Sequence, residues 1–569
     1  MCIMKFKTLI ITLLCGFSSL AQNVYPQYPN PMGNKSYLLS ATFAELRNNA
    51  FHAGVDIKTG TIGKKVFAVA DGYVSRIGVS PYGYGKVVYV THYDGFMSVY
   101  AHLDSFNETI AEYVKNKQYD TKSFKQNIFF EKDEIPVKCG DLLGLSGNTG
   151  GSGGPHLHYE IRDAATQHPL DPFLFGVEIS DRVSPTLNGL AVYPAEKSSV
   201  IGRDTVAFFT LDGGNGEYSP KCKEIKVNGT VSFGLSYFDK TAELNHKYGV
   251  DRIELYAAGT LIFDLNFDEY SYDETRYINS LIDYPRYVKD GKRYVRTEID
   301  EYNILSLYGK RDGFVTVNEG EKLDMKYVVK DKSGNVSTLN FTLVGEKPLK
   351  EFNVTNYSRS YYRVDGRSET FVGLDGLTAK IPEKAFYKFE YVLARQRHDI
   401  KGKFASDCVY ELGSAEIPVQ NSILISIKPS EKYEKSNKLY IVTIGKNGNI
   451  SSLGGKLVDG RVETKVRNLG LFALAVDTIA PEVKPINFSN NACVSECKRL
   501  KIKIKDCETG INKYDIYVND KWVIGEYDAK NNLLFYEIDS HFIKGNNNVK
   551  VVVTDGVNNK TEKSYKLVY

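Results

Sequence analysis

Short runs of alternating apolar and polar residues fill the first third of the chain and predict β-strands. Residues 66–77 read as two strands broken at an Asp-Gly pair, and another strand is expected at 156–161. Residues 86–92 and 96–102 alternate in the same way and are joined by Tyr93-Asp94-Gly95. Because Asp-Gly supplies the positive φ of a tight turn, we predict an antiparallel hairpin there.

Two stretches of this first region do not follow the strand pattern. Residues 141–154 form a loop rich in Gly, Ser and Asn, whereas residues 104–136 are polar and partly compatible with a helix. We interpret 104–136 as an insertion between two core strands of a small antiparallel β-sheet domain that spans 22–177.

The other two-thirds of the chain carry a weak internal repeat. Asp181–Pro185 and Asp477–Pro481 look like matching openers, and similar strand–turn–strand endings recur at 329–337, 444–451 and 553–561. Short strands with Gly/Asn turns are typical of β-sandwich modules. The predicted fold class is therefore mainly β, with the first domain followed by tandem β-sandwich (Ig-like) modules. They are a β-sandwich module at 178–347 with an insertion around 266–310, a β-rich module at 348–476 and an Ig-like β-sandwich module at 477–569.

Composition agrees with a multidomain β-protein. A chain of 569 residues is too long for one hydrophobic core, and its 40 Tyr and 29 Phe favour strands over helix bundles. The formal net charge is only +3. So small a charge gives no electrostatic reason to expect binding to nucleic acid or to an anionic membrane surface.

The N-terminus has the pattern of a signal peptide. Lys5 and Lys7 precede an apolar run from Leu9 to Leu20, and Ala21 closes a small-x-small cleavage signal. The run is too short to span a bilayer comfortably, and no later stretch is long enough. Cys15 leaves a lipoprotein open as the alternative to cleavage after residue 21. We expect an exported protein in the periplasm or cell envelope.

An exported chain can form disulfides, but the cysteines give no clear pairing. Cys493, Cys497 and Cys507 cluster, so Cys507 could pair with either of the other two and one would remain. The isolated Cys139, Cys222 and Cys408 are expected to act as small apolar residues.

Histidines in oriented spacings are the strongest chemical signal. His52 and Asp56 are four residues apart, and His156 and His158 flank Leu157 so that both imidazoles face one side of a strand. His102 ends a third strand-like run. Two His and one carboxylate suit a catalytic Zn²⁺ with an open coordination position, and further His can act as base and oxyanion stabiliser.

Each of these pieces alone has a simpler interpretation. A single His-x-His is often two polar residues on a solvated face, and His-x-x-x-Asp is frequent by chance. Their joint occurrence beside a Gly-rich loop favours a metal site. His92 and His168 are interpreted as structural, and Tyr82 and Tyr84 as packing residues that could line a groove.

The ordered motifs resemble the lysostaphin/LytM family of zinc endopeptidases, over about residues 40–175. They are HAGVD at 52–56, GYGKVVYVTHYDG at 83–95, YAHL at 100–103 and the segment 140–163 that ends in HLHYEIRD. The preceding FAELR at 43–47 is of the kind found in exported multidomain members of the Bacteroidetes, but no catalytic role is assigned to Arg47.

The resemblance implies one Zn²⁺ bound by His52, Asp56 and His158, with His102 and His156 as the catalytic pair that does not bind metal. It also implies hydrolysis of peptide stems or bridges in bacterial peptidoglycan. Because the chain shows no evident wall-binding repeats and has a short leader without a C-terminal wall-sorting tail, we expect diaminopimelate cross-links rather than pentaglycine. Two other functions remain open: a non-catalytic regulator of a partner wall hydrolase, and an exported zinc protease acting on proteins. An envelope partner could bind through the β-modules.

Overall fold

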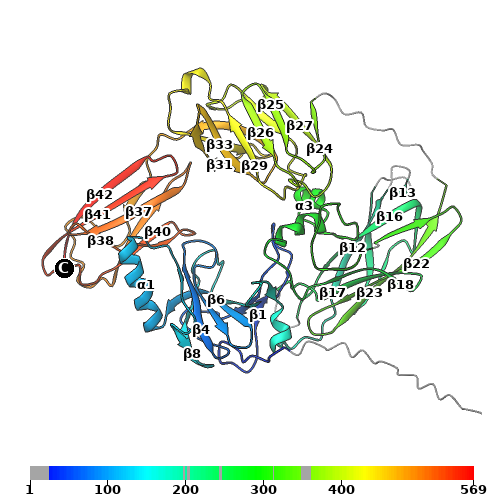
Figure 1. Ribbon diagram of the computed structural model, residues 1–569, viewed down its shortest axis with the longest axis horizontal. Helices are drawn as coiled ribbons and strands as arrows, with labels where there is room; N and C mark the ends of the chain where they lie inside the picture. Colours follow the sequence, from blue (N-terminus) through cyan, green and yellow to red (C-terminus); the bar gives the residue numbers. More distant parts are fainter. Residues whose placement is uncertain (1–24, 196–198, 202–205, 242–245, 312, 348–359) are drawn as a thin grey trace, which may run out of the picture.

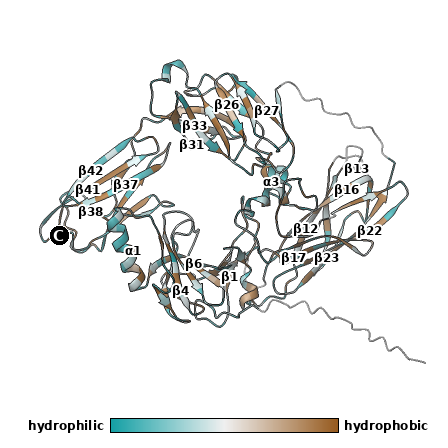
Figure 2. Cartoon of the chain, in the orientation of Figure 1, coloured by the Kyte–Doolittle hydropathy of each residue, from teal (hydrophilic) through white to brown (hydrophobic). Residues whose placement is uncertain are grey.

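Four β-rich units follow one another around a ring in the computed structural model, which describes residues 25–195, 199–201, 206–241, 246–311, 313–347 and 360–569 (Figure 1). The predicted signal peptide lies outside these residues. The prediction of a mainly β fold is confirmed, with 48% strand and 7% helix. Apolar residues gather along the strands of the four units, whereas helix α1 is mostly hydrophilic (Figure 2).

The N-terminal unit is built on a largely antiparallel sheet. Its main path is β1 (Leu39–Ala41), β2 (Val55–Lys58), β10 (His156–Asp163), β6 (Phe96–Phe106), β5 (Lys86–His92), β4 (Gly72–Val79) and β7 (Gln126–Phe129). The remaining strands are β3 (Lys65–Phe67), β8 (Pro136–Val137), β9 (Leu142–Ser146) and β11 (Pro169–Leu170). The predicted hairpin is confirmed, because β5 and β6 pair antiparallel across the turn at 93–95.

The polar segment 104–136 contains helix α1 (Glu108–Thr121) and the edge strand β7. Asn107 caps the helix, since its side chain accepts a hydrogen bond from Ile110 N. Ile110 and Val114 are one turn apart and bury one stripe of the helix in the core of the sheet domain. A short η1 helix (Pro172–Phe175) ends the unit.

The second unit contains twelve strands from 186 to 345. Their order is β13 (Val200–Ile201), β16 (Glu224–Phe238), β12 (Thr186–Pro194), β14 (Ala207–Gly214), β15 (Glu217–Pro220), β23 (Val336–Gly345), β22 (Lys322–Lys330), β17 (Arg252–Ala257), β18 (Thr260–Asn266) and β20 (Tyr308–Arg311), with β19 (Val295–Arg296) and β21 (Phe314–Val317) also paired to β16. Between β18 and β20 lie η2 (Thr275–Tyr277), α2 (Ile278–Leu281) and α3 (Tyr284–Asp290).

The third unit packs a six-stranded sheet on a five-stranded sheet around one apolar core. The first sheet is β24 (Tyr361–Val364), β27 (Glu390–Arg397), β28 (Val409–Leu412), β34 (Gly470–Val476), β30 (Leu439–Ile444) and β31 (Ile450–Gly454). The second is β25 (Thr370–Leu374), β26 (Leu377–Ile381), β29 (Ile423–Ile427), β33 (Arg461–Val466) and β32 (Lys456–Val458), and η3 (Glu431–Tyr433) lies in a connection.

The fourth unit packs two four-stranded sheets face to face. They are β35 (Glu482–Pro485), β36 (Arg499–Lys505), β40 (Leu533–Glu537) and β39 (Glu526–Asp528), and β38 (Lys521–Val523), β37 (Ile511–Val518), β41 (Asn546–Asp555) and β42 (Lys560–Val568). The three predicted strand–turn–strand endings are confirmed as antiparallel hairpins: β22–β23, β30–β31 and β41–β42.

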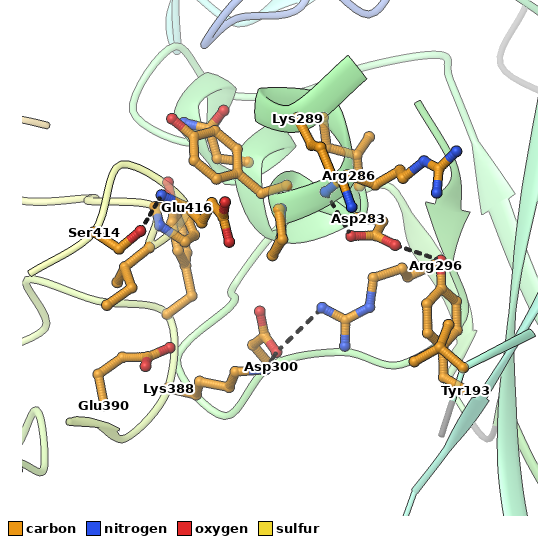
Figure 3. Close-up of a pocket in the computed structure, with 18 of the residues that line it drawn as sticks. Tyr193, Asp283, Arg286, Lys289, Arg296, Asp300, Lys388, Glu390, Ser414 and Glu416 are labelled. Carbon is orange, nitrogen blue, oxygen red and sulfur yellow. Dashed lines mark hydrogen bonds and ion pairs between the residues drawn. The ribbon is translucent and has the colours of Figure 1, made fainter. Parts of the chain in front are cut away.

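Helix α3 and the third unit meet at a polar cavity of about 660 Å³ (Figure 3). Opposite charges pair along its wall. Asp300 lies between Arg296, at 3.7 Å, and Lys388, at 3.3 Å, while Tyr193 donates to Asp283 at 2.9 Å. Tyr387 of the third unit packs into the core of the second, so this junction is fixed by apolar as well as polar contacts.

The cysteines and the helices test two further expectations, on the role of the cysteines and on membrane-spanning segments. Cys408 is buried as predicted, but Cys139 and Cys222 are exposed, which corrects their interpretation as small apolar core residues. Both lie in polar turns at the ends of strands. All six described cysteines are free, so neither candidate disulfide is present. Over the described part of the chain, no helix is long and apolar enough to cross a membrane.

Candidate metal centre

His52 lies on the segment that leads into β2, and the backbone holds it on both sides. Its N–H donates to Glu45 O at 3.0 Å, and its carbonyl accepts from Ala44 N at 2.8 Å. In the side chain, Nδ1 lies 2.7 Å from Thr42 O. Because a carbonyl can only accept, Nδ1 carries the proton and the lone pair of the ring is on Nε2.

Close approach of this segment to β10 requires the glycine of HAGVD. A Cβ on Gly54 would lie 2.2 Å from Tyr159 O, well inside van der Waals contact. Two residues later, Asp56 sits directly opposite His158 in the antiparallel β2–β10 register. Strand register therefore brings this carboxylate and this imidazole together from positions that are 102 residues apart.

Strand β10 presents four polar side chains to one face. His156, His158, Glu160 and Arg162 alternate with residues that enter the core, namely Leu157, Tyr159 and Ile161. His158 Nε2 lies 2.7 Å from Glu160 Oε1. Because Glu160 accepts a hydrogen bond from Nε2, Nδ1 is the nitrogen that can offer a lone pair to a metal. Without an ion, Nδ1 can hold a proton that it donates to Asp56 Oδ1, since burial is outweighed by Asp56 and Glu160, which raise the pKa of His158 to about 9.

Three ligand atoms face one another at the centre of the site. Asp56 Oδ1 lies 2.8 Å from His158 Nδ1 and 3.1 Å from His52 Nε2, and the two nitrogens are 3.1 Å apart. Atoms with lone pairs approach this closely only when a proton or a metal ion lies among them, and a metal ion can take the place of the proton. A tetrahedral Zn²⁺ takes His nitrogen and carboxylate oxygen at about 2 Å, so one ion fits these three donors and keeps a fourth position.

The charges around these donors favour an ionised Asp56 and Glu160. Burial alone would raise the pKa of Asp56, but His52, His156 and His158 hold it well below its usual value. Burial also opposes ionisation of Glu160, yet Arg162 and His158 lower its pKa. Both carboxylates are thus charged at neutral pH, one as a metal donor and one as the acceptor that orients His158.

His102 lies beside this centre in an unusual backbone conformation. Its φ is +61°, which is rare for a residue with a side chain, and it lies in the stretch where the register between β5 and β6 shifts. Its Nδ1 lies 2.8 Å from Thr149 O, so Nδ1 donates and Nε2 has a free lone pair. Burial, together with His158 and His156, lowers the pKa of His102 to about 3 and keeps it neutral.

His156 completes the group from the first position of β10. Its Nδ1 lies 2.8 Å from Gly154 O, and its Nε2 lies 3.5 Å from Asp56 Oδ1. The rings of His156 and His102 are 4.8 Å apart. The structure therefore brings together all five residues that the sequence analysis named: three as converging donors and two as neighbours on the open side.

Comparison with known families agrees with this geometry. The sequence model of Peptidase family M23 matches residues 50–172, which include all five residues.

Residues 50–172 are an M23 peptidase domain.

The M23 family is a family of zinc metallopeptidases, so the donor set and the family agree on one Zn²⁺. A second sequence model, the Zu5-like domain, matches residues 362–477 in the third unit.

Relatives of known name are similar to the M23 domain and little beyond it. The DD-carboxypeptidase/endopeptidase Mpg of Neisseria meningitidis is 30% identical over 149 residues, which are 26% of this chain and 27% of the relative. The cell division protein DipM of Caulobacter vibrioides is 35% identical over 20% of this chain and 15% of the relative. Lysostaphin of Staphylococcus staphylolyticus is 29% identical over 25% and 26%. The match to Mpg spans about a quarter of that relative's length.

Five residues that support the M23 site were not assigned this role from the sequence. Arg47 Nη2 pairs with Asp56 Oδ2 at 3.1 Å, and Arg162 pairs with Glu160 at 2.6 Å. Glu160 also accepts from Tyr84, as well as from Tyr272 at 2.8 Å. The continued alternation in HLHYEIRD could have indicated Glu160 and Arg162. Nothing in the sequence connects Tyr272 to the site, because it comes from the second unit.

Other residues singled out in the M23 domain have structural contacts. His92 is buried, and its Nε2 lies 2.7 Å from Ser98 Oγ. His168 pairs with Glu269 of the second unit at 2.9 Å. Tyr84 packs on the ring of His158 with centroids 5.3 Å apart, while Tyr82 is exposed.

Proposed function

We propose that the chain is a zinc metalloendopeptidase that hydrolyses peptide cross-links of bacterial peptidoglycan, with metal ligands His52, Asp56 and His158. The observation that carries the proposal is the convergence of three lone-pair donors within 3.1 Å of one another, beside two further histidines. Mpg, which is similar to this M23 domain, is named as a DD-carboxypeptidase/endopeptidase, and this supports a peptide cross-link as substrate.

When bound, zinc supplies Lewis-acid chemistry that makes a water molecule acidic enough to attack an amide carbonyl near neutral pH. Because Nδ1 of His102 donates to Thr149 O, its Nε2 is available to accept the proton of the attacking water. We assign stabilisation of the oxyanion to His156 in its doubly protonated form, since Nδ1 already donates to Gly154 O and only that form has a second N–H on Nε2.

Two single variants separate metal binding from proton transfer. We expect His158→Ala to lose both bound zinc and activity, because it removes a donor. His102→Ala should retain one zinc per chain and lose at least 100-fold in kcat, since general acid–base catalysis contributes about 10²–10⁴-fold. Metal analysis and mass spectrometry of the muropeptides released from purified sacculi give the two readouts.

Three results would count against the proposal. Full activity in either variant contradicts the site, and cleavage of casein or elastin in preference to sacculi contradicts the substrate. Retained zinc with no muropeptide release by the unmodified chain would favour a regulator of another hydrolase.

We further propose that the protein acts in the cell envelope and that its fourth unit is an Ig-like module. The leader pattern in residues 1–21 and the similarity to the DD-carboxypeptidase/endopeptidase Mpg support the location, and the two packed four-stranded sheets support the module. Fractionation of cells, with the N-terminal residue of the mature chain determined by sequencing, tests it: intact Met1 on a cytoplasmic protein contradicts export.

A further inference from the structure

A second group of acidic side chains lies at one end of the second unit. Asp181 belongs to the segment before β12, Asp239 follows β16 and Asp331 follows β22. One carboxylate oxygen from each lies within 4.8 Å of the other two. Asp239 is 3% exposed and Asp331 is 2% exposed, so two of the three are almost completely buried.

Within the described part of the chain, two oxygens of this group lack a donor, although Asp331 accepts from Ser333 and Asn335, and Asp181 Oδ1 accepts from Val183 N. Among the described residues, Asp239 Oδ1 and Asp181 Oδ2 are buried without any hydrogen-bond partner. The charges that act on Asp239 are the carboxylates of Asp331 and Asp181, and these add to burial in raising its pKa to about 8. A buried, unpaired carboxylate is costly, so a group of three calls for a bound cation.

Other acidic groups in the described chain are compensated from within. Lys332 Nζ lies 2.6 Å from Asp171 and 2.8 Å from Asp251, and so pairs with two of the three carboxylates in the group that these form with Asp268. Asp300 pairs with Arg296 and Lys388, as Figure 3 shows for Arg296.

The fourth unit contains a matching group that is saturated. Asp477 Oδ2 accepts from Thr509 Oγ1 at 2.7 Å, and Asp506 Oδ2 accepts from three backbone N–H groups, those of Glu508, Thr509 and Gly510. Asp555 occupies the position in the β41–β42 turn that Asp331 occupies in the β22–β23 turn. In each turn the Asn four residues later donates from its side chain to this Asp. The two groups thus share a scaffold, but they differ in the number of buried carboxylate oxygens that lack a hydrogen-bond donor.

We propose that Asp181, Asp239 and Asp331 bind a calcium ion at the end of the second unit. Carboxylate oxygens are ligands for hard cations, and Ca²⁺ accepts a flexible, irregular set of six to eight oxygens, whereas Mg²⁺ demands a near-ideal octahedron. Zn²⁺ prefers nitrogen and sulfur donors, which this group lacks.

The ion would join the linker after the M23 domain to the sheet of the second unit. Asp181 lies in that linker, and Asn335 Nδ2 reaches its carbonyl at 3.4 Å. Tyr248, which pairs with Asp239 through the backbone, donates from its hydroxyl to Leu39 O of the M23 domain at 2.9 Å. Calcium at this place therefore fixes the angle at which the two units meet.

Equilibrium dialysis with radioactive calcium tests the site in the full-length, zinc-saturated protein. We expect one calcium per chain, retained in excess magnesium, and at least ten-fold weaker binding in Asp239→Asn. The matched control Asp506→Asn should bind calcium as the unmodified protein does. Without calcium, Asp239→Asn should be at least as heat-stable as the unmodified protein, because it removes one charge from the group.

Several outcomes would overturn the proposal. They are no calcium bound by the unmodified chain, equal binding by Asp239→Asn, displacement by magnesium, or loss of calcium in Asp506→Asn alone. If Asp239→Asn does not fold, Asp181→Asn, at a partly exposed position, takes its place with the same expected result. The zinc content of each variant is measured alongside and should not change, which keeps this test separate from that of the M23 site.

Discussion

Glu160 connects the metal ligands to the rest of the molecule at the scale of single residues. It is completely buried and accepts hydrogen bonds from His158, Arg162 and Tyr272, which lie on both sides of the junction between the first two units. Its bond to His158 decides which ring nitrogen faces the metal. Outer partners of this kind usually tune metal affinity as strongly as they orient the ligand.

Exchange of this carboxylate for an amide should weaken zinc binding. We expect Glu160→Gln to bind zinc about 10–100-fold more weakly, because the hydrogen bond that fixes the His158 tautomer loses its charged acceptor. Competition with a chromophoric zinc chelator measures the affinity. The control is Tyr272→Phe, which removes only one donor to Glu160 and should change the zinc affinity less. Equal affinity in all three proteins would refute this role of Glu160.

At the scale of secondary-structure elements, the geometry of the site depends on how closely the segment 52–54 approaches β10. Gly54→Ala should lower the opening free energy of β2 by about 1–3 kcal/mol, because its Cβ would collide with Tyr159 O. Hydrogen exchange of the β2 and β10 amides measures the change. Gly153→Ala, at a site with no atom within 4 Å of the added Cβ, should exchange like the unmodified protein. If the amides of both variants exchange as slowly as those of the unmodified protein, then β2 tolerates the added Cβ.

The strands were largely predictable from the sequence, and so was the proximity of the five histidine and aspartate side chains. Period-two alternation identified β5, β6 and β10, and the spacings within 52–56 and 156–158 put donors on the right faces. The prediction for α1 was incomplete, because its apolar stripe is only Ile110 and Val114 among polar residues. The exposure of Cys139 and Cys222 was also missed, because a lone cysteine carries no pattern that places it on the surface.

The ring closes through contacts between the fourth unit and the M23 domain, at the scale of the whole molecule (Figure 1). Lys86 pairs with Glu526 at 3.1 Å, and Tyr119 of α1 stacks on His541 with centroids 5.6 Å apart. Lys530 donates to Asn148 O and, at 3.0 Å, to Ser152 O. These carbonyls belong to the loop that holds His102 through Thr149 O.

Removal of the lysine that holds this loop should slow catalysis without loss of metal. We expect Lys530→Ala to lower kcat by about ten-fold, since small misplacements of catalytic groups are costly. Zinc content should stay at one per chain. Lys563→Ala, on an exposed position of β42, is the matched control with unchanged kcat on muropeptide substrate. A higher kcat in Lys530→Ala would mean that the contact restrains the site instead.

None of this closure was predictable from the sequence. Lys86 and Glu526 are 440 residues apart, and single polar pairs leave no periodic signal. The same holds for the junction before β2, where Phe43 and Phe51 pack into the core of the second unit around Tyr270. A boundary drawn near 178 from turn residues could not reveal that the segment carrying His52 depends on the unit beyond it.

The position of Lys530 has a consequence for the order in which a working enzyme is made. The ribosome releases the M23 domain first, and more than 350 residues must follow before this lysine can reach the backbone of Ser152. A chain interrupted anywhere in the third unit would carry all five histidine and aspartate side chains, yet would lack the support for its catalytic loop. Full activity of the first part of the protein is therefore expected only after the last part has been synthesised.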